Sequence, residues 1–500
     1  MSQAEAALSH FWNKLGRFLP LTETLPVPFV PPPPRVEPLE DALGQSLQQR
    51  FPGDLLRLDT ETLCAYCASH DYPGFVRRMS GATAPQAVLY PSSEQDLADM
   101  LLWAAEREIG LWNWGSGQAM PDPTQLEGTP YMVTDLARMN RVLEFNESKQ
   151  RIRVQAGLRW AELRAWLMEK DLATGLAFMD DTVSVGAALA HGMFNLNALG
   201  YGGLRANVYA LRGMTPAGPL QLERSLPGAA DLRGLLLGAQ QHFGILTETT
   251  LRLRPLPTES SYLLVSFPSW DKAITALRRL LTLDGGLLRA GILSADELTL
   301  FSTEPPVSWM QNLRSRLSNP TPKIAYLMLE LTVPKDAVAK KRQQIEALLK
   351  EGEEPLETNN KVNAIQGHIL SNRRVLLPHL WRYNVLAHTV TAAAPWTEIA
   401  AFRRDWEEAL QSIIQATGET RGLTLTTLHA TLDEAVLHTL VLGLQSPEHA
   451  LSREEQVQAI EAVAQETQRR WSINTATPTL LTQALQAVSE TLDPQGVLLG

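Results

Sequence analysis

The sequence is poor in the features that mark disulfide-rich, secreted and membrane-spanning proteins. Only two cysteines, Cys64 and Cys67, occur in 500 residues, which excludes a disulfide framework. They form a lone Cys-x-x-Cys without the second pair of a zinc site, so two small residues of a helix are favoured over a redox pair. No stretch approaches about 18 consecutive apolar residues, and the N-terminus lacks the order of a secretory signal. These absences predict a cytoplasmic protein without a transmembrane segment.

Two common nucleotide-binding signatures are also missing. No Gly-x-Gly-x-x-Gly opens a helix, which disfavours a Rossmann nicotinamide domain, and no P-loop lysine is present for ATP. Because 54 acidic side chains outnumber 44 basic ones, the net charge of −10 argues against nucleic acid as a partner. The remaining composition, 44% hydrophobic and 20% charged, is typical of a globular chain with two or three domains.

Residues 1–80 are expected to form an N-terminal extension. Within it, residues 1–20 predict an amphipathic helix, with apolar side chains at Ala6, Leu8, Phe11, Leu15 and Phe18. Residues 26–38 are dense in proline and predict a stiff, extended linker. Because the helix has few basic residues, we expect it to pack against the body of the protein or against a partner rather than on a membrane. A protein partner bound through this helix and linker is therefore one interpretation.

The rest of the chain alternates strands and helices. It opens with a strand, a helix and a strand at 87–90, 93–107 and 109–114. Further strands and one helix of the same region are predicted at 132–134, 151–156, 160–170 (the helix) and 245–253. A second region is typical of an antiparallel sheet with helices on one face. Its predicted strands are 263–267, 324–331 and 435–442, and its long helices are 334–350, 397–416 and 452–470.

Three glycine-bearing turns could hold an adenine dinucleotide, because its two phosphates must meet backbone N–H groups at close range. The first is the sequence Trp-Gly-Ser-Gly-Gln at 114–118, and the second is Ser-Val-Gly-Ala at 184–187. The third runs over 238–245 and ends in Gly-Ile. Each turn alone is equally typical of an ordinary structural turn, so the case depends on their order and surroundings.

Taken in order, these turns and their neighbours resemble the FAD-linked oxidase family, which includes glycolate oxidase large subunits, D-lactate dehydrogenases and alkylglycerone-phosphate synthases. The resemblance is strong between Ala84 and Pro257. TDLARMNRV at 134–142 is similar to the family's DLSRMNRI, VQAGLRW at 154–160 to VQAGVxW, and GILTETTLRL at 244–253 to GIITEATLRL. Several matches in the right order are far more specific than one motif.

The resemblance implies an α+β fold with two domains after the extension. Residues 81–257 would form a two-lobed FAD-binding domain of the vanillyl-alcohol-oxidase (PCMH) type, and residues 258–470 a ferredoxin-like, antiparallel-sheet cap domain that binds substrate. Residues 471–500 would return to the FAD domain, because LDPQGV at 492–497 resembles the family's C-terminal LDPxGI.

FAD is the cofactor that the resemblance implies, held without a covalent bond because the first turn has no histidine or cysteine. The residues carried over as its contacts are Trp114, Gly115, Ser116, Gly117, Gln118, Ala119, Met120, Ser184, Val185, Gly186, Ala187, Gly244 and Ile245. The sequence departs from the family at three places. The first turn lacks the usual third glycine and following Thr-Ser, and Ala187 and Gln241 stand where glycine is usual. Because each added Cβ costs about 1 kcal/mol where it narrows a tight turn, FAD binding is expected to be weakened.

Candidate catalytic residues come from the cap. His429 and His438 stand in a segment that resembles the family's His-x-Gly-Asp-Gly-Asn-x-His, but with wider spacing and no Gly-Asn, so we expect substrate contact or a structural role and no metal. His388 is a candidate base, with a buried structural histidine as the alternative. Arg382, with Arg373 and Arg374, is a candidate clamp for a carboxylate, with solvated helix charges as the alternative.

These residues predict an FAD-dependent oxidoreductase that removes a hydride from a small hydroxylated substrate, such as a 2-hydroxy acid, to flavin N5. An alternative is a catalytically degenerate, FAD-free subunit of a larger complex, which the altered turns would also explain. A third, a synthase without net redox chemistry, depends only on the moderate similarity of residues 383–406 to the alkylglycerone-phosphate synthases. The run of histidines that those synthases carry before their last helix is missing at 474–478.

Overall fold

The structure is a computed structural model, in which contacts divide the chain into two units. Unit 1 contains residues 1–30, 196–201 and 257–475, and unit 2 contains residues 31–195, 202–256 and 476–500. The expected N-terminal extension is thus divided between the two units. The described residues are 3–19, 21, 27–37, 39–117, 131–225, 229–257, 260–283, 285–301, 324–333, 337–349, 355–358, 376–383, 385–416, 419–445, 453–471 and 479–499.

Unit 2 contains a small, mainly parallel sheet with the order β1 (Leu56–Arg57), β2 (Val88–Leu89), β4 (Tyr131–Thr134) and β3 (Gly110–Asn113). Strands β2 and β3 both run parallel to β4, so a crossover must join them. That crossover is α5 (Glu94–Ala105), which begins where the Ser93 side chain accepts a hydrogen bond from the Asp96 N–H. This is the strand–helix–strand opening that the sequence predicts.

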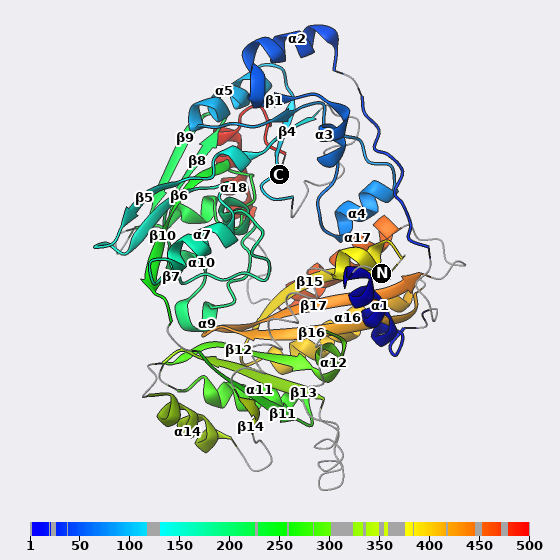
Figure 1. Ribbon diagram of the computed structural model, residues 1–500, viewed down its shortest axis with the longest axis vertical. Coiled ribbons are helices and arrows are strands. Elements are labelled where there is room, and N and C mark those ends of the chain that lie inside the picture. Colours follow the sequence, from blue (N-terminus) through cyan, green and yellow to red (C-terminus); the bar gives the residue numbers. More distant parts are fainter. Residues whose placement is uncertain are drawn as a thin grey trace. The chain divides into compact units, whose positions relative to one another are not determined.

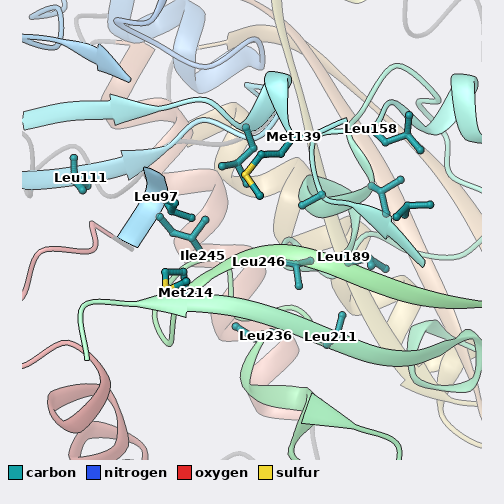
Figure 2. Close-up of a cluster of buried hydrophobic side chains, with 14 of the residues drawn as sticks. Leu97, Leu111, Met139, Leu158, Leu189, Leu211, Met214, Leu236, Ile245 and Leu246 are labelled. Carbon is teal, nitrogen blue, oxygen red and sulfur yellow. The ribbon is translucent and has the colours of Figure 1, made fainter. Parts of the chain in front are cut away.

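The second sheet of unit 2 is antiparallel, with the order β5 (Val142–Asn146), β6 (Arg151–Gln155), β10 (Ile245–Pro255), β8 (Val208–Thr215) and β9 (Gly218–Glu223), and β7 (Leu172–Thr174) also pairs with β10. One hydrophobic cluster joins the two sheets (Figure 2). It contains Leu97 and Leu111 from the α5–β3 region, Leu211 and Met214 from β8, and Ile245 from β10. The strands of this domain are thus ordered around one core.

Three short helices precede the β2–α5–β3 segment and belong to unit 2: α2 (Asp41–Arg50), α3 (Thr60–Ala65) and α4 (Tyr72–Met79). Aspartates begin α3 and α4, because Asp59 accepts from the Thr62 N–H and Asp71 from the Gly74 N–H. Cys67 is fully buried in a cluster with Leu63, Trp112 and Trp114, and both cysteines are free. The segment from α3 to α4 therefore packs beside β3.

Unit 1 is built on a seven-stranded sheet whose strand pairs are all antiparallel (Figure 1). The strand order is β14 (Pro355–Thr358), β11 (Ser261–Phe267), β13 (Ala325–Leu331), β12 (Leu287–Ser294), β16 (Glu419–Ala430), β17 (Glu434–Gln445) and β15 (Val385–Pro395). Four of these strands, β12, β14, β15 and β16, were not predicted from the sequence, and in β15 the run of three alanines weakens the apolar alternation. The antiparallel sheet of the predicted cap domain is confirmed.

Helices lie on both faces of this sheet. On one face, α11 (Trp270–Leu280), α14 (Val338–Leu348), α16 (Ile399–Ala416) and α17 (Arg453–Trp471) contact one another, and the Trp406 indole N–H of α16 donates to Thr439 of β17. The next residue of β17, Leu440, points the other way and packs with α1 (Gln3–Leu15) and α12 (Ala295–Phe301). The prediction of helices on one face was therefore incomplete.

The N-terminal helix packs inside unit 1. Leu8, Phe11 and Leu15 are at most 5% exposed, in a cluster with Phe301 and Leu440. The apolar face of α1 is therefore already covered by its own chain and is not a free docking surface for a partner. Among the described residues, no helix combines the length and the apolar character that crossing a bilayer requires.

Candidate functional site

The first glycine turn lies in unit 2, directly after β3. Its backbone needs glycine, because Gly115 has φ +58° and Gly117 has φ +72°, in the left-handed region that L side chains rarely adopt. A Cβ on Gly117 would also lie 2.7 Å from Cζ2 of Trp114. The Gly117 N–H donates to the Trp114 carbonyl, which closes the turn. Trp114 itself is 6% exposed and packs on Trp112, with ring centroids 5.0 Å apart.

The second turn joins the first at the start of α8 (Val185–Ala190). The buried Ser116 hydroxyl accepts a hydrogen bond of 3.1 Å from the Ser184 N–H, and the Ser184 hydroxyl accepts one from the Ala187 N–H. A Cβ on Gly115 would lie 3.1 Å from Cβ of Ala187. The Ala187 methyl group, a departure from the family pattern, therefore fills the space between the two turns.

The third turn is held by the side chain of Gln241. Its amide oxygen accepts from the Asn113 N–H at 2.8 Å, and its amide nitrogen donates to the carbonyls of Leu111, at 3.0 Å, and Leu499. The side chain is only 6% exposed. Gln241 therefore connects the third turn, β3 and the C-terminal segment, whereas the sequence suggested an obstacle to the ligand. Two more residues of this turn were predicted to contact FAD. The Gly244 N–H donates to the Gln241 carbonyl, and Ile245 pairs with Met214 in the sheet.

The remaining donors of these turns fit a diphosphate. The N–H groups of Val185 and Gly186 are already bonded to the carbonyls of Leu158 and Ala156. In contrast, the N–H groups of Gly115 and Ser116 have no hydrogen-bond partner within the described ranges. The Ser116 and Ser184 hydroxyls each accept a bond, which leaves their protons able to donate. Adjacent backbone donors in a glycine turn are what phosphate oxygens require. Gln118, Ala119 and Met120 lie outside the described residues.

Two side chains that sequence reasoning missed surround the first turn. The Tyr66 hydroxyl donates to Asp135 at 2.6 Å, and its ring lies 4.6 Å from the Trp114 ring. Burial raises the pKa of Asp135, against the lowering effect of the Tyr66 hydrogen bond. The second is His70, whose ring packs edge-on against Trp114 with centroids 5.2 Å apart, and whose backbone N–H donates to the Gly117 carbonyl at 2.6 Å. Tyr66 and His70 precede every segment that carries the family resemblance, so no motif pointed to them.

In unit 1, two predicted histidines meet on one face of the sheet. His429 of β16 and His438 of β17 have ring centroids 5.0 Å apart. In the sheet register, His438 lies between Thr427 of β16 and Thr391 of β15. Directly paired residues share a face, so these side chains form one polar row. We call this face, with the side chains described next, the polar face.

A buried carboxylate and an arginine complete the polar face. Glu297 of α12 is fully buried, and the Thr427 hydroxyl donates to its two carboxylate oxygens at 2.7 and 2.9 Å. Arg289 lies two residues before Gly291, which pairs with His429. Residues two apart on a strand share a face, so Arg289 also belongs to the polar face.

The Arg289 guanidinium uses only one of its three nitrogens in contacts with the described residues. Its Nε donates to Asn197 at 2.6 Å and lies 3.4 Å from a carboxylate oxygen of Glu330. Its two terminal nitrogens have no hydrogen-bond partner in the part of the chain that the structure describes. Glu330 in turn accepts from the hydroxyls of Ser260 and Tyr262. Burial, followed by the negative charge of Glu330, raises the pKa of Tyr262. Sequence reasoning missed Arg289, because only the pairing of β12 with β16 brings it to the histidines.

The other predicted catalytic residues lie elsewhere. His388 of β15 points to the opposite face, where its Nε2 lies 3.2 Å from Glu461 of α17. Arg382 is exposed and precedes β15. In the row of paired residues that contains His429, the residue of β15 is Ala393, which lies eight residues after the strand's first residue, Val385. At about 3.3 Å per residue, the start of β15 is roughly 26 Å from that row along the strand, and Arg382 lies before this start. Arg373 and Arg374 lie outside the described residues.

No metal centre accompanies the two histidines in the described ranges. No group of three or more histidine, cysteine, aspartate or glutamate side chains there is arranged to hold a metal ion.

Two family models match the chain over most of its length. The FAD binding domain matches residues 85–221, and the C-terminal domain of FAD linked oxidases matches residues 256–468. The D-2-hydroxyglutarate dehydrogenase of Stutzerimonas stutzeri is 29% identical over 205 residues, which are 39% of this chain and 43% of that protein. The glycolate oxidase subunit GlcD of Bacillus subtilis is 25% identical over 327 residues, 63% of this chain and 66% of that subunit. The match thus spans less than half of the first relative.

Solved structures show the same fold. A structure of alkyldihydroxyacetonephosphate synthase has a TM-score of 0.77 at 16% identity and covers 98% of this chain and 91% of its own. The 4-ethylphenol oxidase from Gulosibacter chungangensis has a TM-score of 0.65 at 17% identity, over 92% of this chain and 97% of its own. These likenesses confirm the predicted fold class, an FAD-binding domain of the PCMH type with an antiparallel-sheet cap domain. With the two matched domains, they establish that the chain belongs to the FAD-linked oxidase family and that its cofactor is FAD.

Proposed function

We propose that the protein oxidises a small 2-hydroxy acid, with FAD as the hydride acceptor. Bound FAD supplies an electrophilic N5 that takes the hydride from the carbon bearing the hydroxyl group. The residues of unit 2 bind the diphosphate through the N–H groups of Gly115 and Ser116 and the hydroxyls of Ser116 and Ser184. Because residues 114–117 contain no histidine or cysteine, we propose that this turn holds FAD without a covalent bond.

The polar face of unit 1 supplies the groups that a 2-hydroxy acid needs. A planar guanidinium with two uncommitted terminal nitrogens can bind a carboxylate with two parallel hydrogen bonds, and Arg289 provides one. A neutral imidazole can take the hydroxyl proton as hydride leaves, and His429 and His438 are the candidates. The observation that carries the proposal is that these three side chains share one face of the sheet.

The names of relatives support the substrate class. Two of the relatives are called D-2-hydroxyglutarate dehydrogenase and glycolate oxidase subunit GlcD, and both names refer to 2-hydroxy acids. The carboxylate and adjacent hydroxyl of such acids match one arginine beside two histidines. The proposal therefore rests on the chemistry of the polar face, with the relatives as independent support.

The test is reduction of the FAD-loaded protein by D-lactate, D-2-hydroxyglutarate and glycolate in the absence of oxygen, with 1,2-propanediol as the neutral partner of lactate. Because charge-assisted hydrogen bonds contribute about 1.5–3 kcal/mol, Arg289→Met should lower kcat/KM for the acids by about 10- to 100-fold. It should change turnover of the diol far less. Arg382→Met should change neither, because Arg382 is exposed and lies before the far end of β15. Equal losses on acid and diol, or a selective loss only with Arg382→Met, would contradict the assignment.

The alternative of a degenerate, FAD-free subunit makes a different prediction. Purified protein would be colourless and would release no flavin on heating, and added FAD would not raise its melting temperature. A ligand that binds the native state must stabilise it by mass action, so such a result would overturn the oxidation proposal. A yellow protein whose flavin is bleached by a 2-hydroxy acid would exclude the subunit interpretation.

A further inference from the structure

The second sheet of unit 2 carries a hollow on the face that points away from its core. In this sheet, β6, β10, β8 and β9 lie side by side (Figure 1). Ile152 and Leu251 point into the hydrophobic cluster of unit 2, so their strand neighbours Arg151 and Thr250 point the other way. A hollow of about 280 Å³ lies among these outward side chains, and we call it the sheet hollow. Its lining residues belong neither to the glycine turns nor to the polar face.

Short side chains in the two middle strands form the floor of the sheet hollow. Four directly paired residues cross the sheet in one row, from Arg153 of β6 through Thr250 of β10 and Ala210 of β8 to Glu223 of β9. The two middle side chains are short and the two outer ones are long, so the row is lowest in its middle. Because strand pairing fixes all four positions, the hollow is built into the sheet itself.

The charge of the outward side chains changes sign along β10. Glu248, Thr250 and Arg252 follow one another at intervals of two residues, so they share the outward face. The carboxylate of Glu248 is balanced by Arg153, whose terminal nitrogen lies 3.1 Å from it. Arg252 has no such partner within the described ranges. The Arg252 side of Thr250 therefore carries unbalanced positive charge.

Two more cations lie beside Arg252. Arg151 of β6 is directly paired with it, and Lys149 lies in the turn just before β6. Among the residues that the structure describes, none of these three side chains forms a hydrogen bond or an ion pair. Like charges on directly paired residues destabilise a sheet, and here no carboxylate offsets the repulsion. An anion bound between the three cations would offset it.

The ring of Tyr209 holds one of these cations in a fixed orientation. The guanidinium carbon of Arg151 lies 3.3 Å from the centre of the Tyr209 ring, so the guanidinium stacks on the ring. Stacking leaves the N–H groups at the edge of the guanidinium able to donate pairs of hydrogen bonds to phosphate oxygens. Both residues line the sheet hollow. The stacked arginine is therefore a preformed donor for an anion that enters the hollow.

The β9 side of the sheet hollow offers hydrogen-bond acceptors instead. One carboxylate oxygen of Glu223 accepts from the Gln221 amide at 3.2 Å, and the other has no partner in the described part of the chain. A carboxylate repels a phosphate but accepts hydrogen bonds from hydroxyl groups. The Thr250 hydroxyl lies on the floor between the two sides. The sheet hollow thus suits a ligand with an anionic group at one end and hydroxyl groups on its body.

We propose that the sheet hollow binds a phosphorylated sugar or polyol, with its phosphate among Lys149, Arg151 and Arg252 and its hydroxyl groups toward Thr250 and Glu223. A phosphate monoester carries about two negative charges at neutral pH, which suits three cations better than the single charge of a carboxylate. The site is additional to the FAD site and to the polar face, and the proposed oxidation does not depend on it.

The experiment titrates glucose 6-phosphate into the FAD-loaded full chain and measures the heat of binding. Bound FAD occupies the glycine turns, so they cannot take the phosphate. Inorganic phosphate and glucose are titrated in the same way at one ionic strength, because salt screens exposed charges. Glucose 6-phosphate should bind saturably, inorganic phosphate more weakly and glucose not at all, because both the phosphate and the body of the ligand are recognised.

Substitutions locate the binding site. Arg151→Met keeps an unbranched side chain over Tyr209 but loses the charge, so the dissociation constant should rise about 10- to 100-fold. Arg107→Met is the matched control, because Arg107 stacks on Trp103 at 4.3 Å but pairs with Glu106 and lies outside the sheet hollow. This variant should bind as the wild type does. If Arg151→Met fails to fold, Lys149→Met on the exposed turn should also raise the dissociation constant.

Arg252→Gln separates ligand binding from a structural role. The variant removes one of two paired cations, so without ligand its melting temperature should equal or exceed that of the wild type. Glucose 6-phosphate should raise the melting temperature of the wild type much more than that of the variant, because a ligand stabilises the state that binds it. A variant that melts earlier than the wild type without ligand would show a structural role for Arg252 and count against the proposal.

Other results would overturn the proposal as well. They are a wild type that does not bind glucose 6-phosphate, inorganic phosphate that binds as tightly as the ester, and equal effects of Arg151→Met and Arg107→Met. None of these measurements involves hydride transfer, so each can be read even if the protein oxidises no hydroxy acid.

Discussion

Replacing Gln241 by glycine tests whether this residue is a departure that weakens FAD binding or a structural connection. Glycine is the residue that the family usually has there, so a comparison of sequences alone would predict improved FAD binding. The structure predicts the opposite outcome, because the Gln241 side chain makes three hydrogen bonds to Asn113, Leu111 and Leu499.

The expected loss in the free energy of unfolding is estimated from the hydrogen bond that each partner of Gln241 loses. The Asn113 N–H is left without its acceptor, which costs about 1–3 kcal/mol for a group shielded from water. The Leu111 carbonyl keeps a second donor, the Leu499 N–H at 3.1 Å, so its loss is smaller. The Leu499 bond contributes about 0.5–1.5 kcal/mol, the Leu111 bond less than that, and glycine adds about 0.5–1 kcal/mol of backbone freedom in the unfolded chain. We expect Gln241→Gly to lower the free energy of unfolding by about 2–5 kcal/mol.

The neighbouring residue provides a matched control. Gln240 is exposed and has φ +50°, a conformation that favours glycine. Gln240→Gly should therefore be neutral or stabilise the protein by up to about 1 kcal/mol. The same substitution at adjacent positions thus has opposite expected signs.

The assay is thermal unfolding with and without FAD. For a unit of this size, about 1 kcal/mol corresponds to a shift of roughly 2–4 °C, so Gln241→Gly should lower the melting temperature by roughly 5–15 °C. FAD affinity measured well below that temperature should not improve. A Gln241→Gly variant as stable as the wild type, or one that binds FAD more tightly, would refute the reasoning.

Two further predictions concern stability. Thr439→Val should lower the free energy of unfolding in urea by about 1–3 kcal/mol, because the buried Trp406 indole N–H loses its acceptor at 2.9 Å. The same substitution at the exposed Thr389 should lower it little, and equal effects of the two variants would argue against this bond. Burial holds the pKa of His70 below 6.5 in the folded protein, so this histidine binds a proton more tightly in the unfolded chain. The stability that is present above pH 6.5 therefore declines as the pH falls through the folded pKa. Wild-type protein should therefore lose more stability than His70→Phe between pH 7.5 and 5.5, and parallel urea midpoints of the two proteins would contradict this.

Much of the fold could be predicted from the sequence because its signals are local. The apolar spacing of α5, α16 and α17 predicts helices within a few residues of their observed ends. The glycines of the first turn are a local requirement as well, since Gly115 and Gly117 both have positive φ. Such signals identified the family and its FAD-binding domain.

The polar face could be predicted only in part. His429 and His438 were candidates because their segment resembles a family motif, and the β16–β17 hairpin brings them together because they lie on either side of its turn. His388 and Arg382 were grouped with these histidines only because their residue types suit a base and a carboxylate clamp. A shift of one residue along a strand moves a side chain to the other face of a sheet, and no local pattern fixed the register of β15.

The sequence by itself determined the family, the domain types and the glycine turn, because each depends on residues close together in the chain. Only the tertiary structure decided the roles of Arg289, Gln241 and His70. The pairing of β12 with β16 places Arg289 on the same face as His429, Gln241 joins β3 to the C-terminal segment, and the backbone N–H of His70 bonds the Gly117 carbonyl from an earlier segment. Contacts between residues so far apart in the chain arise from packing and strand register, which no periodicity within one segment encodes.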